Sequence, residues 1–245
     1  LMVLCPAQCR AALSLYADRQ RKLARLSQLP AEYAALTFES FLELPDAQRD
    51  GKMLGYFGAK LFAEARDHTV NLSDLAQKFQ HKAADDCRNW LVLYGDYGMG
   101  KTGLAAAIVH SLVDQGKPVL YIRLQDFLDA VRKRYDARRR SEGFDDGFGN
   151  DTSDDVIDTV REAPVLVMDE FDVPKVSEDK LGIVENIIRY RHGHRLPTVI
   201  TTNLDETTME ARWQGVITSV VRQRAHWLLM AGVSLRPVPA KVGWE

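Results

Sequence analysis

Residues 90–107 read WLVLYGDYGMGKTGLAAA, and this stretch decides the predicted fold. Trp90 to Tyr94 is a short apolar run rich in aromatic and β-branched residues, which is typical of a buried strand. Gly95 to Thr102 fits the pattern G-x-x-x-x-G-K-[ST]. Apolar residues then recur at helical spacing, at Leu104, Ala105, Ile108, Val109 and Leu112. A strand, a glycine loop and a helix in this order predict a phosphate-binding loop.

The glycine loop carries the residue types that a polyphosphate needs. Gly95, Gly98 and Gly100 let successive backbone N–H groups turn toward one oxyanion, and the following helix adds its positive N-terminal end. Lys101 can reach the β and γ phosphates, and the Thr102 hydroxyl can bind Mg²⁺. The alternative, a chance glycine turn, is disfavoured by the flanking strand and helix. The predicted nucleotide contacts are Gly95, Asp96, Tyr97, Gly98, Met99, Gly100, Lys101 and Thr102.

Strands and helices alternate along the rest of the chain, which predicts an α/β fold with a parallel sheet. Further strands are expected at Val119–Leu124, Val165–Met168, Pro197–Thr202 and, last and shortest, Val233–Arg236. Helices are expected at about 11–29, 46–66, 71–88, 126–140, 153–162, 177–190, 206–212 and 216–230, with 31–44 as a linker that lies back on the next domain.

Polar side chains follow two of these strands where the strands end. Asp169 and Glu170 come directly after Val165–Met168, and Asn203 follows Pro197–Thr202. Parallel α/β sheets place their ligands at the carboxyl edge, so these side chains are expected beside the glycine loop. Asp169 is predicted to hold Mg²⁺ directly or through water, Glu170 to act as the general base, and Asn203 to position the attacking water.

At this point the sequence resembles a known family. GDYGMGKT, VLVMDE, LPTVITTN, SVVRQR and GVSLR look like the DnaC, DnaI and IstB branch of the AAA+ ATPases, and LPAEYAALTFESF resembles the linker of that branch. The resemblance covers about Leu29 to Arg236. It implies a P-loop NTPase of AAA+ type with a five-stranded parallel sheet of order 5-1-4-3-2 between helices. Members load the replicative helicase onto DNA or assist a transposase.

The resemblance also implies roles for single residues. Gly95 to Thr102 would be Walker A, Asp169 and Glu170 Walker B, and Asn203 sensor 1. Arg222 or Arg224 would be an arginine finger that completes the ATPase site of a second copy, so a homo-oligomer is expected. Arg236 would be the sensor 2 residue beside the nucleotide. The spacing leaves open which of the two arginines is the finger.

The chain has 245 residues and a net charge of −2, so any nucleic-acid surface must be local. We expect a basic helix and linker in residues 1–45 and the ATPase domain in residues 46–245. The segment Arg132–Arg140 holds six basic residues and one acid, and residues 142–158 hold seven acids. The basic segment is either a contact to single-stranded DNA or a solvated face. No apolar run approaches the length of a membrane span.

Three cysteines are present. Cys87 is expected to be a small, partly buried residue in a helix. Cys5 and Cys9 form C-x₃-C, which is half of a tetrahedral zinc site, or they are two unrelated cysteines near the chain end. Because the sequence begins with Leu1 rather than Met, it is interpreted as a fragment. The cysteine usage favours a reducing, cytoplasmic location.

Other nucleotide-binding classes fit less well. A GTPase needs an Asn-Lys-x-Asp motif, which the sequence lacks. A small-molecule kinase needs an arginine-rich lid, which Arg132–Arg140 could imitate, and this stays a remote alternative. An adaptor that binds ATP without hydrolysis would not need Lys101, Asp169, Glu170 and Asn203 together. A helicase loader and a transposase helper share these residues, so the sequence does not separate them.

Overall fold

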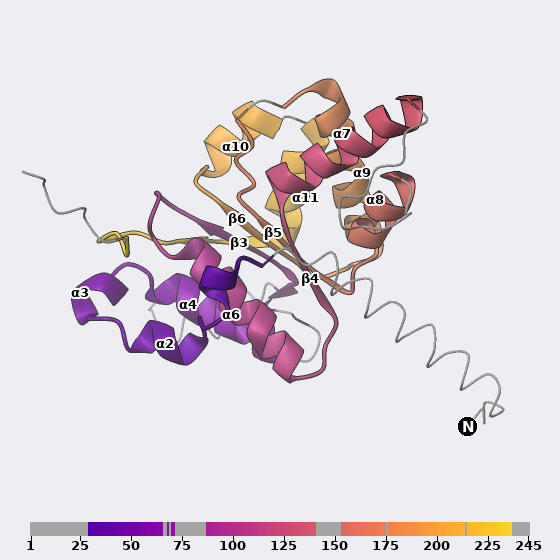
Figure 1. Ribbon diagram of the computed structural model, residues 1–245. Coiled ribbons are helices and arrows are strands. Elements are labelled where there is room, and N and C mark those ends of the chain that lie inside the picture. The colour runs from indigo at the N-terminus through magenta and orange to yellow at the C-terminus, as the bar shows by residue number, and fades with distance from the viewer. Residues whose placement is uncertain are drawn as a thin grey trace, which may run out of the picture.

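The computed structural model describes residues 29–65, 68, 70–71, 87–140, 153–174, 176–213 and 215–236. A five-stranded sheet runs through the centre, and all of its neighbouring strands are parallel (Figure 1). Its order is β4-β5-β6-β3-β7, which in chain order is the predicted 5-1-4-3-2 read from β7 to β4. The strands are β3 (Trp90–Tyr94), β4 (Val119–Arg123), β5 (Val165–Asp169), β6 (Thr198–Thr202) and β7 (Ala225–Leu229).

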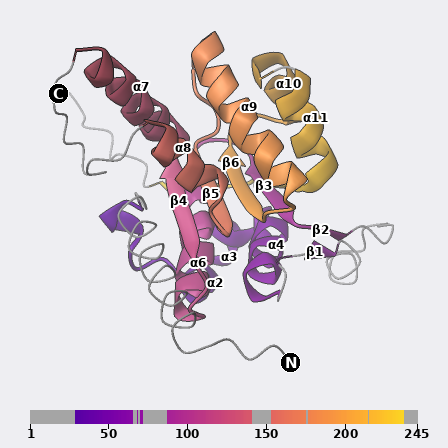
Figure 2. The same ribbon diagram turned by 90° about the vertical axis from the view of Figure 1, so that its right-hand side faces the viewer.

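Helices cover both faces of the sheet (Figure 2). Side chains of β3 alternate between the two faces, because Trp90 and Val92 join one apolar cluster while Leu91 and Leu93 join the other. One face packs against α2 (Phe38–Leu42), α4 (Met53–Glu64) and α6 (Lys101–Asp114). The opposite face packs against α7 (Leu124–Arg140), α8 (Ser153–Arg161), α9 (Glu178–Gly193), α10 (Glu206–Trp213) and α11 (Gly215–Arg224).

The C-terminal part of the sheet differs from the prediction. The helix expected at 216–230 ends at Arg224, and Ala225–Leu229 forms β7, which pairs with β3 in parallel register. The apolar spacing of α11 runs on into β7, so periodicity alone extended the helix too far. The strand expected at Val233–Arg236 is also wrong. This segment instead crosses the glycine loop, and Leu235 N donates to Gly98 O at 2.7 Å.

The N-terminal elements differ as well. The helix expected at 46–66 is two helices, α3 (Asp46–Arg49) and α4, separated at Gly51. Gly51 has a φ of 75°, and a Cβ there would lie 2.7 Å from Ala231 O. The expected linker holds the 3₁₀ helix η1 (Ala31–Tyr33) and α2, which begins with a capping box between Thr37 and Ser40.

Short strands β1 (Val70–Asn71) and β2 (Cys87–Arg88) pair in antiparallel fashion. Cys87 therefore lies in a strand and not in the expected helix. Residues 72–86, the helix expected at 11–29, Cys5, Cys9 and most of the acidic stretch lie outside the described residues. None of the described helices has the length and apolarity that a membrane span requires.

Candidate nucleotide-binding site

The glycine loop between β3 and α6 has a backbone that only glycine accommodates at its ends. Gly95 has a φ of 142°, and a Cβ there would overlap Met230 O. Gly100 has a φ of 85° and directly precedes the first turn of α6. The loop therefore leads the chain from the sheet edge into a helix N-terminus, which is the arrangement that favours bound phosphate.

Lys101 is the first residue of α6, and its side chain is buried at this edge of the sheet. Its Nζ donates to Gly95 O, Asp96 O and Asn203 Oδ1, each at 2.7 Å. Burial lowers the pKa of Lys101, while the negative charges of Asp172 and Asp169 oppose this shift. The ammonium group is thus held by neutral oxygens, which the charged oxygens of a phosphate can replace.

Asp169 ends β5 and is fully buried. Its Oδ1 accepts from Thr102 Oγ1 at 3.1 Å and from the Thr201 hydroxyl, and its Oδ2 accepts from Tyr121 OH at 2.6 Å. Burial and the charge of Asp169 raise the pKa of Tyr121, which therefore stays a donor. A hydroxyl and a carboxylate side by side suit Mg²⁺, which takes few protein ligands and completes its shell with phosphate and water. Among the described residues, no group of three or more His, Cys, Asp or Glu forms a separate metal cluster.

Glu170 follows Asp169 in a left-handed conformation, with a φ of 55°. Its backbone N donates to Thr201 Oγ1 at 3.1 Å, and its side chain is half exposed toward the cavity. Arg123, at the end of β4, donates from Nη2 to Glu170 Oε2 at 2.8 Å. The carboxylate is thus accessible to water and paired with a cation from the neighbouring strand.

Asn203 follows β6 and links the glycine loop to an acid that the sequence analysis missed. Its Oδ1 faces Lys101, and its Nδ2 donates to Asp172 Oδ2. Asp172 was detectable as the third acid of Asp-Glu-Phe-Asp after β5, but its contact with Asn203 depends on the neighbouring strand.

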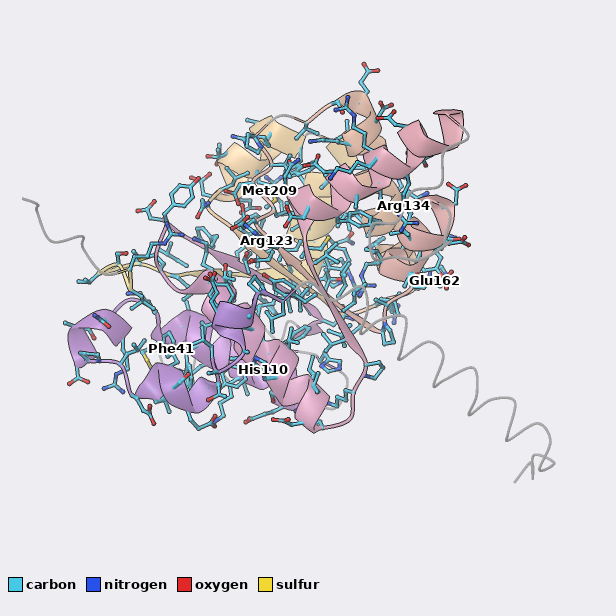
Figure 3. The ribbon with its side chains drawn as sticks, viewed as in Figure 1. Phe41, His110, Arg123, Arg134, Glu162 and Met209 are labelled. Atoms are coloured by element: carbon cyan, nitrogen blue, oxygen red, sulfur yellow. The ribbon has the colours of Figure 1, made fainter. Side chains whose placement is uncertain are left out.

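A cavity of about 710 Å³ lies over these groups. Leu235 and Arg236 form part of its wall, so Arg236 lies beside the glycine loop. Another part of the wall comes from the segment that contains η1 and α2, which was expected to be a linker lying back on the next domain. Its members are Tyr33, Leu36, Thr37, Ser40, Phe41 and Leu44. Figure 3 labels Phe41 in this layer and Arg123 at the sheet.

Comparisons with known proteins agree with this geometry. The model of the IstB-like ATP-binding protein family matches residues 75–224, more than half of the chain. The chain belongs to this family. It is 32% identical to the replicative helicase loader DnaC of Escherichia coli K12 over 112 residues, 46% of this chain and 41% of that protein. It is 27% identical to the ATP-binding protein of insertion sequence IS1162 from Pseudomonas fluorescens, over 49% of this chain and 46% of that protein.

The fold has relatives among solved structures. The crystal structure of DnaI superimposes with a TM-score of 0.58 at 20% identity, over 84% of this chain and 96% of that chain. This likeness shows that the two chains share a fold. The alignment with Escherichia coli DnaC covers less than half of that protein, so what DnaC does as a whole is not transferred by the alignment.

The two candidate finger arginines of this IstB-like protein lie away from its own glycine loop. Arg222 and Arg224 end α11 just before β7, and Ala225 is paired with Trp90, the first residue of β3. The glycine loop begins after Tyr94, the last residue of β3. Five residues of strand span roughly 15 Å, so both arginines lie at the amino ends of the strands, and the glycine loop lies at their carboxyl ends.

Arg222 and Arg224 differ in their partners. Arg222 Nη2 pairs with Glu210 Oε2 at 2.9 Å, and its Nε pairs with Glu206. Arg224 donates from Nη2 to the neutral Asn89 Oδ1 at 2.7 Å, and its buried Nε has no acceptor among the described residues. Burial lowers the pKa of Arg224, and the nearby charge of Arg195 lowers it further.

The basic residues of α7 differ in their exposure to solvent. Arg132 and Lys133 are exposed, whereas Arg134 is only 7% exposed. Arg134 therefore does not belong to an open phosphate-binding face, contrary to the expectation. The side chains of Arg138, Arg139 and Arg140 lie outside the described residues.

Proposed function

We propose that this protein is a Mg²⁺-dependent ATPase that acts in DNA replication as a DnaC- or DnaI-like helicase loader. The observation that carries the proposal is the convergence of Lys101, Thr102, Asp169 and Glu170 at one sheet edge, with Thr102 Oγ1 3.1 Å from Asp169 Oδ1. A phosphate-binding lysine, a metal-binding pair and an accessible carboxylate are the parts that phosphoryl transfer to water requires.

Each part has a defined task. The loop N–H groups and Lys101 bind the β and γ phosphates, with Lys101 exchanging its three neutral acceptors for phosphate oxygens. Thr102 and Asp169 would hold Mg²⁺, which supplies charge neutralisation when bound. Glu170 accepts a proton from the attacking water, and Arg236 contacts the phosphates from the cavity wall. The apolar side chains of η1 and α2 that line the cavity would exclude water from that part of it.

The direct test is nucleotide binding and turnover. A fluorescent ATP analogue should bind the protein, and phosphate release should require Mg²⁺ and stop with EDTA. Binding without turnover, in the presence or absence of single-stranded DNA, would contradict the ATPase and leave the non-catalytic adaptor. Transfer of phosphate to a metabolite instead of water would favour the kinase alternative.

The proposal includes a site shared between two copies of the chain. Arg222 and Arg224 are too far from their own loop to reach its γ phosphate, so an arginine from a neighbour would act there. Arg224 is the better candidate, because its partner is a neutral amide while Arg222 is paired with two acids. Mixing Lys101→Ala with Arg224→Ala chains should restore turnover, and no rescue would mean that the site is complete within one chain.

The partners remain part of the proposal. Similarity to the helicase loader DnaC supports a replicative helicase, and similarity to the ATP-binding protein of insertion sequence IS1162 supports a transposase as the alternative. Single-stranded DNA is proposed from the basic residues of α7. Single-stranded DNA binding that falls steeply with salt and depends on Arg132 and Lys133 would support a phosphate contact on α7. Loading of a hexameric helicase, compared with stimulation of a transposase, separates the two partners. A cytoplasmic location follows from either one.

A further inference from the structure

Asp172 accepts hydrogen bonds from both the backbone and the side chain of Asn203. Its Oδ2 accepts from Asn203 Nδ2, and its Oδ1 accepts from Asn203 backbone N at 3.4 Å. Asp172 lies in the loop that follows β5, three residues after Asp169, and it lines the cavity. One carboxylate therefore holds the backbone and the side chain of the residue that follows β6.

The loop that carries Asp172 is fixed by α10 and β6. Arg212 Nη1 donates to Asp172 O at 3.3 Å and to Val173 O at 3.0 Å. Trp213 Nε1 donates to Phe171 O at 3.0 Å, and Phe171 N donates to Thr201 O at 2.8 Å. Asp172 is thus held on both sides along the chain, so its carboxylate is a rigid reference point.

The charges on either side of Asn203 decide how its amide is turned. Its Oδ1 accepts from Lys101 Nζ at 2.7 Å, while its Nδ2 faces Asp172. A turn of 180° about the last side-chain bond would put the NH₂ group against an ammonium and the oxygen against a carboxylate. Both contacts would be repulsive, so the anion on one side and the cation on the other select one orientation.

We infer that Asp172 is a positioning residue that fixes the Asn203 amide with its oxygen toward Lys101 and the phosphate side of the cavity. This inference rests on the proposed ATPase function. Asn203 then offers an acceptor, not a donor, to the reacting groups. A water that donates one hydrogen to Glu170 and the other to Asn203 Oδ1 keeps a lone pair free for the γ phosphorus. As its oxygen bonds to that phosphorus, its first proton passes to Glu170, and the bond to the bridging oxygen breaks to release ADP.

The experiment is a double-mutant cycle on ATP turnover with Asp172→Asn, Asn203→Ala and the combined variant. Asp172→Asn keeps the shape but removes the charge, so the Asn203 amide is free to turn. We expect kcat to fall about 10- to 100-fold with KM within about threefold, because a misplaced reacting group costs that much. In the Asn203→Ala background the same substitution should leave kcat unchanged. Asp114→Asn, at the exposed C-terminal end of α6, is the matched control.

A second measurement does not depend on turnover. The side-chain amide signal of Asn203 in a ¹⁵N NMR spectrum, assigned by its loss in Asn203→Ala, should be protected from solvent exchange in the wild type. Asp172→Asn should remove that protection. Equal kcat losses in both backgrounds, or unchanged protection, would overturn the inference while leaving the ATPase intact. Lost protection in a chain that binds ATP but never hydrolyses it would refute the ATPase and the role of Asp172 in it, while confirming the contact.

Discussion

Lys101 and Arg191 are two buried cations that are held by neutral oxygens. Lys101 lies at the carboxyl ends of the strands, and Arg191 lies at their amino ends. Lys101 meets two carbonyls and one amide oxygen beside the cavity. Arg191, on α9, donates to the carbonyls of Val160, Arg161, Ala163 and Pro197 and to Thr198 Oγ1. Burial lowers the pKa of both, that of Arg191 to about 9.

The two cations differ in whether phosphate or water can replace their hydrogen-bond acceptors. Three of the acceptors of Arg191 are carbonyls at or just past the end of α8, so the guanidinium closes that helix end and ties it to β6. Arg191 itself is fully buried, so water does not reach the guanidinium to take the place of these acceptors. The acceptors of Lys101 face a cavity in which phosphate or water can take their place. A cation among fixed acceptors stabilises the fold, whereas a cation among replaceable acceptors is available for a ligand.

Lys101→Ala should separate the two roles most strongly. It removes at least two charge-assisted contacts to phosphate, each worth about 1.5–3 kcal/mol, so ATP affinity should fall about 100-fold or more. The free energy of unfolding should change by less than about 1 kcal/mol, because water reaches the released oxygens. Titration of a fluorescent ATP analogue and a urea melt measure the two effects. Lys60→Ala on the surface of α4 is the control, and retained ATP affinity in Lys101→Ala would break the comparison.

Glu170→Gln tests whether the chemistry needs more than the buried cation. The amide keeps the size of the side chain but cannot accept a proton, so turnover should fall about 10²- to 10⁴-fold with ATP binding retained. Single-turnover phosphate release gives the rate, and the exposed Glu178→Gln on α9 serves as the control. Undiminished hydrolysis would remove Glu170 from the mechanism.

Arg191→Met should show the reverse of Lys101→Ala. Methionine fills much of the space but leaves the Arg161 and Ala163 carbonyls without the donor that Arg191 supplies, each at about 1–3 kcal/mol, so unfolding should become easier by about 3 kcal/mol or more. ATP affinity, measured well below the new melting temperature, should stay within about threefold. Arg191→Lys should lose nearly as much stability, because one ammonium cannot reach five acceptors. A stable Arg191→Met chain with weakened ATP binding would invalidate the distinction.

The position of Lys101 could be predicted from the sequence, whereas the burial of Arg191 could not. Asp169 ends its strand, and the glycine loop, Glu170 and Asn203 each directly follow a strand. Local pattern and the rule that ligands bind at the carboxyl ends of the strands therefore predict where these groups meet. The order of the sheet came from the resemblance and is confirmed. Arg191 looks like any basic residue in the last turn of a helix, and its burial depends on the end of α8, about 30 residues earlier in the chain.

The errors have the same origin. The mistaken helix over Ala225–Leu229 arose because burial of β7 is decided by β3, more than 130 residues away, and not by local spacing. The cavity wall from η1 and α2 and the contact of Asp172 with Asn203 likewise depend on packing between distant segments. Motifs thus predict the groups that are fixed by their own strand, and they miss the groups that a second element brings in.

Arg123 extends the comparison to an exposed cation with charged partners, and it should give the smallest effect. Its side chain is 38% exposed, and it pairs with Glu170 at 2.8 Å and with Asp126 at 3.6 Å. The pair with Glu170 raises the pKa of Arg123, and it occupies one oxygen of the proposed base. Because exposed pairs are worth about 0.2–1 kcal/mol, Arg123→Ala should raise kcat by no more than about fivefold, with KM unchanged.

Arg123→Lys is the matched variant, because it keeps the charge and should leave kcat near that of the wild type. Added salt should shrink the difference between the wild type and Arg123→Ala, since the pair is open to screening. If kcat instead falls more than about tenfold in Arg123→Ala and recovers in Arg123→Lys, Arg123 would contact the reacting groups themselves. An exposed cation at this end of the sheet would then contact the nucleotide as Lys101 is proposed to do. Burial would in that case no longer distinguish a cation that binds the ligand from a cation that only forms surface ion pairs.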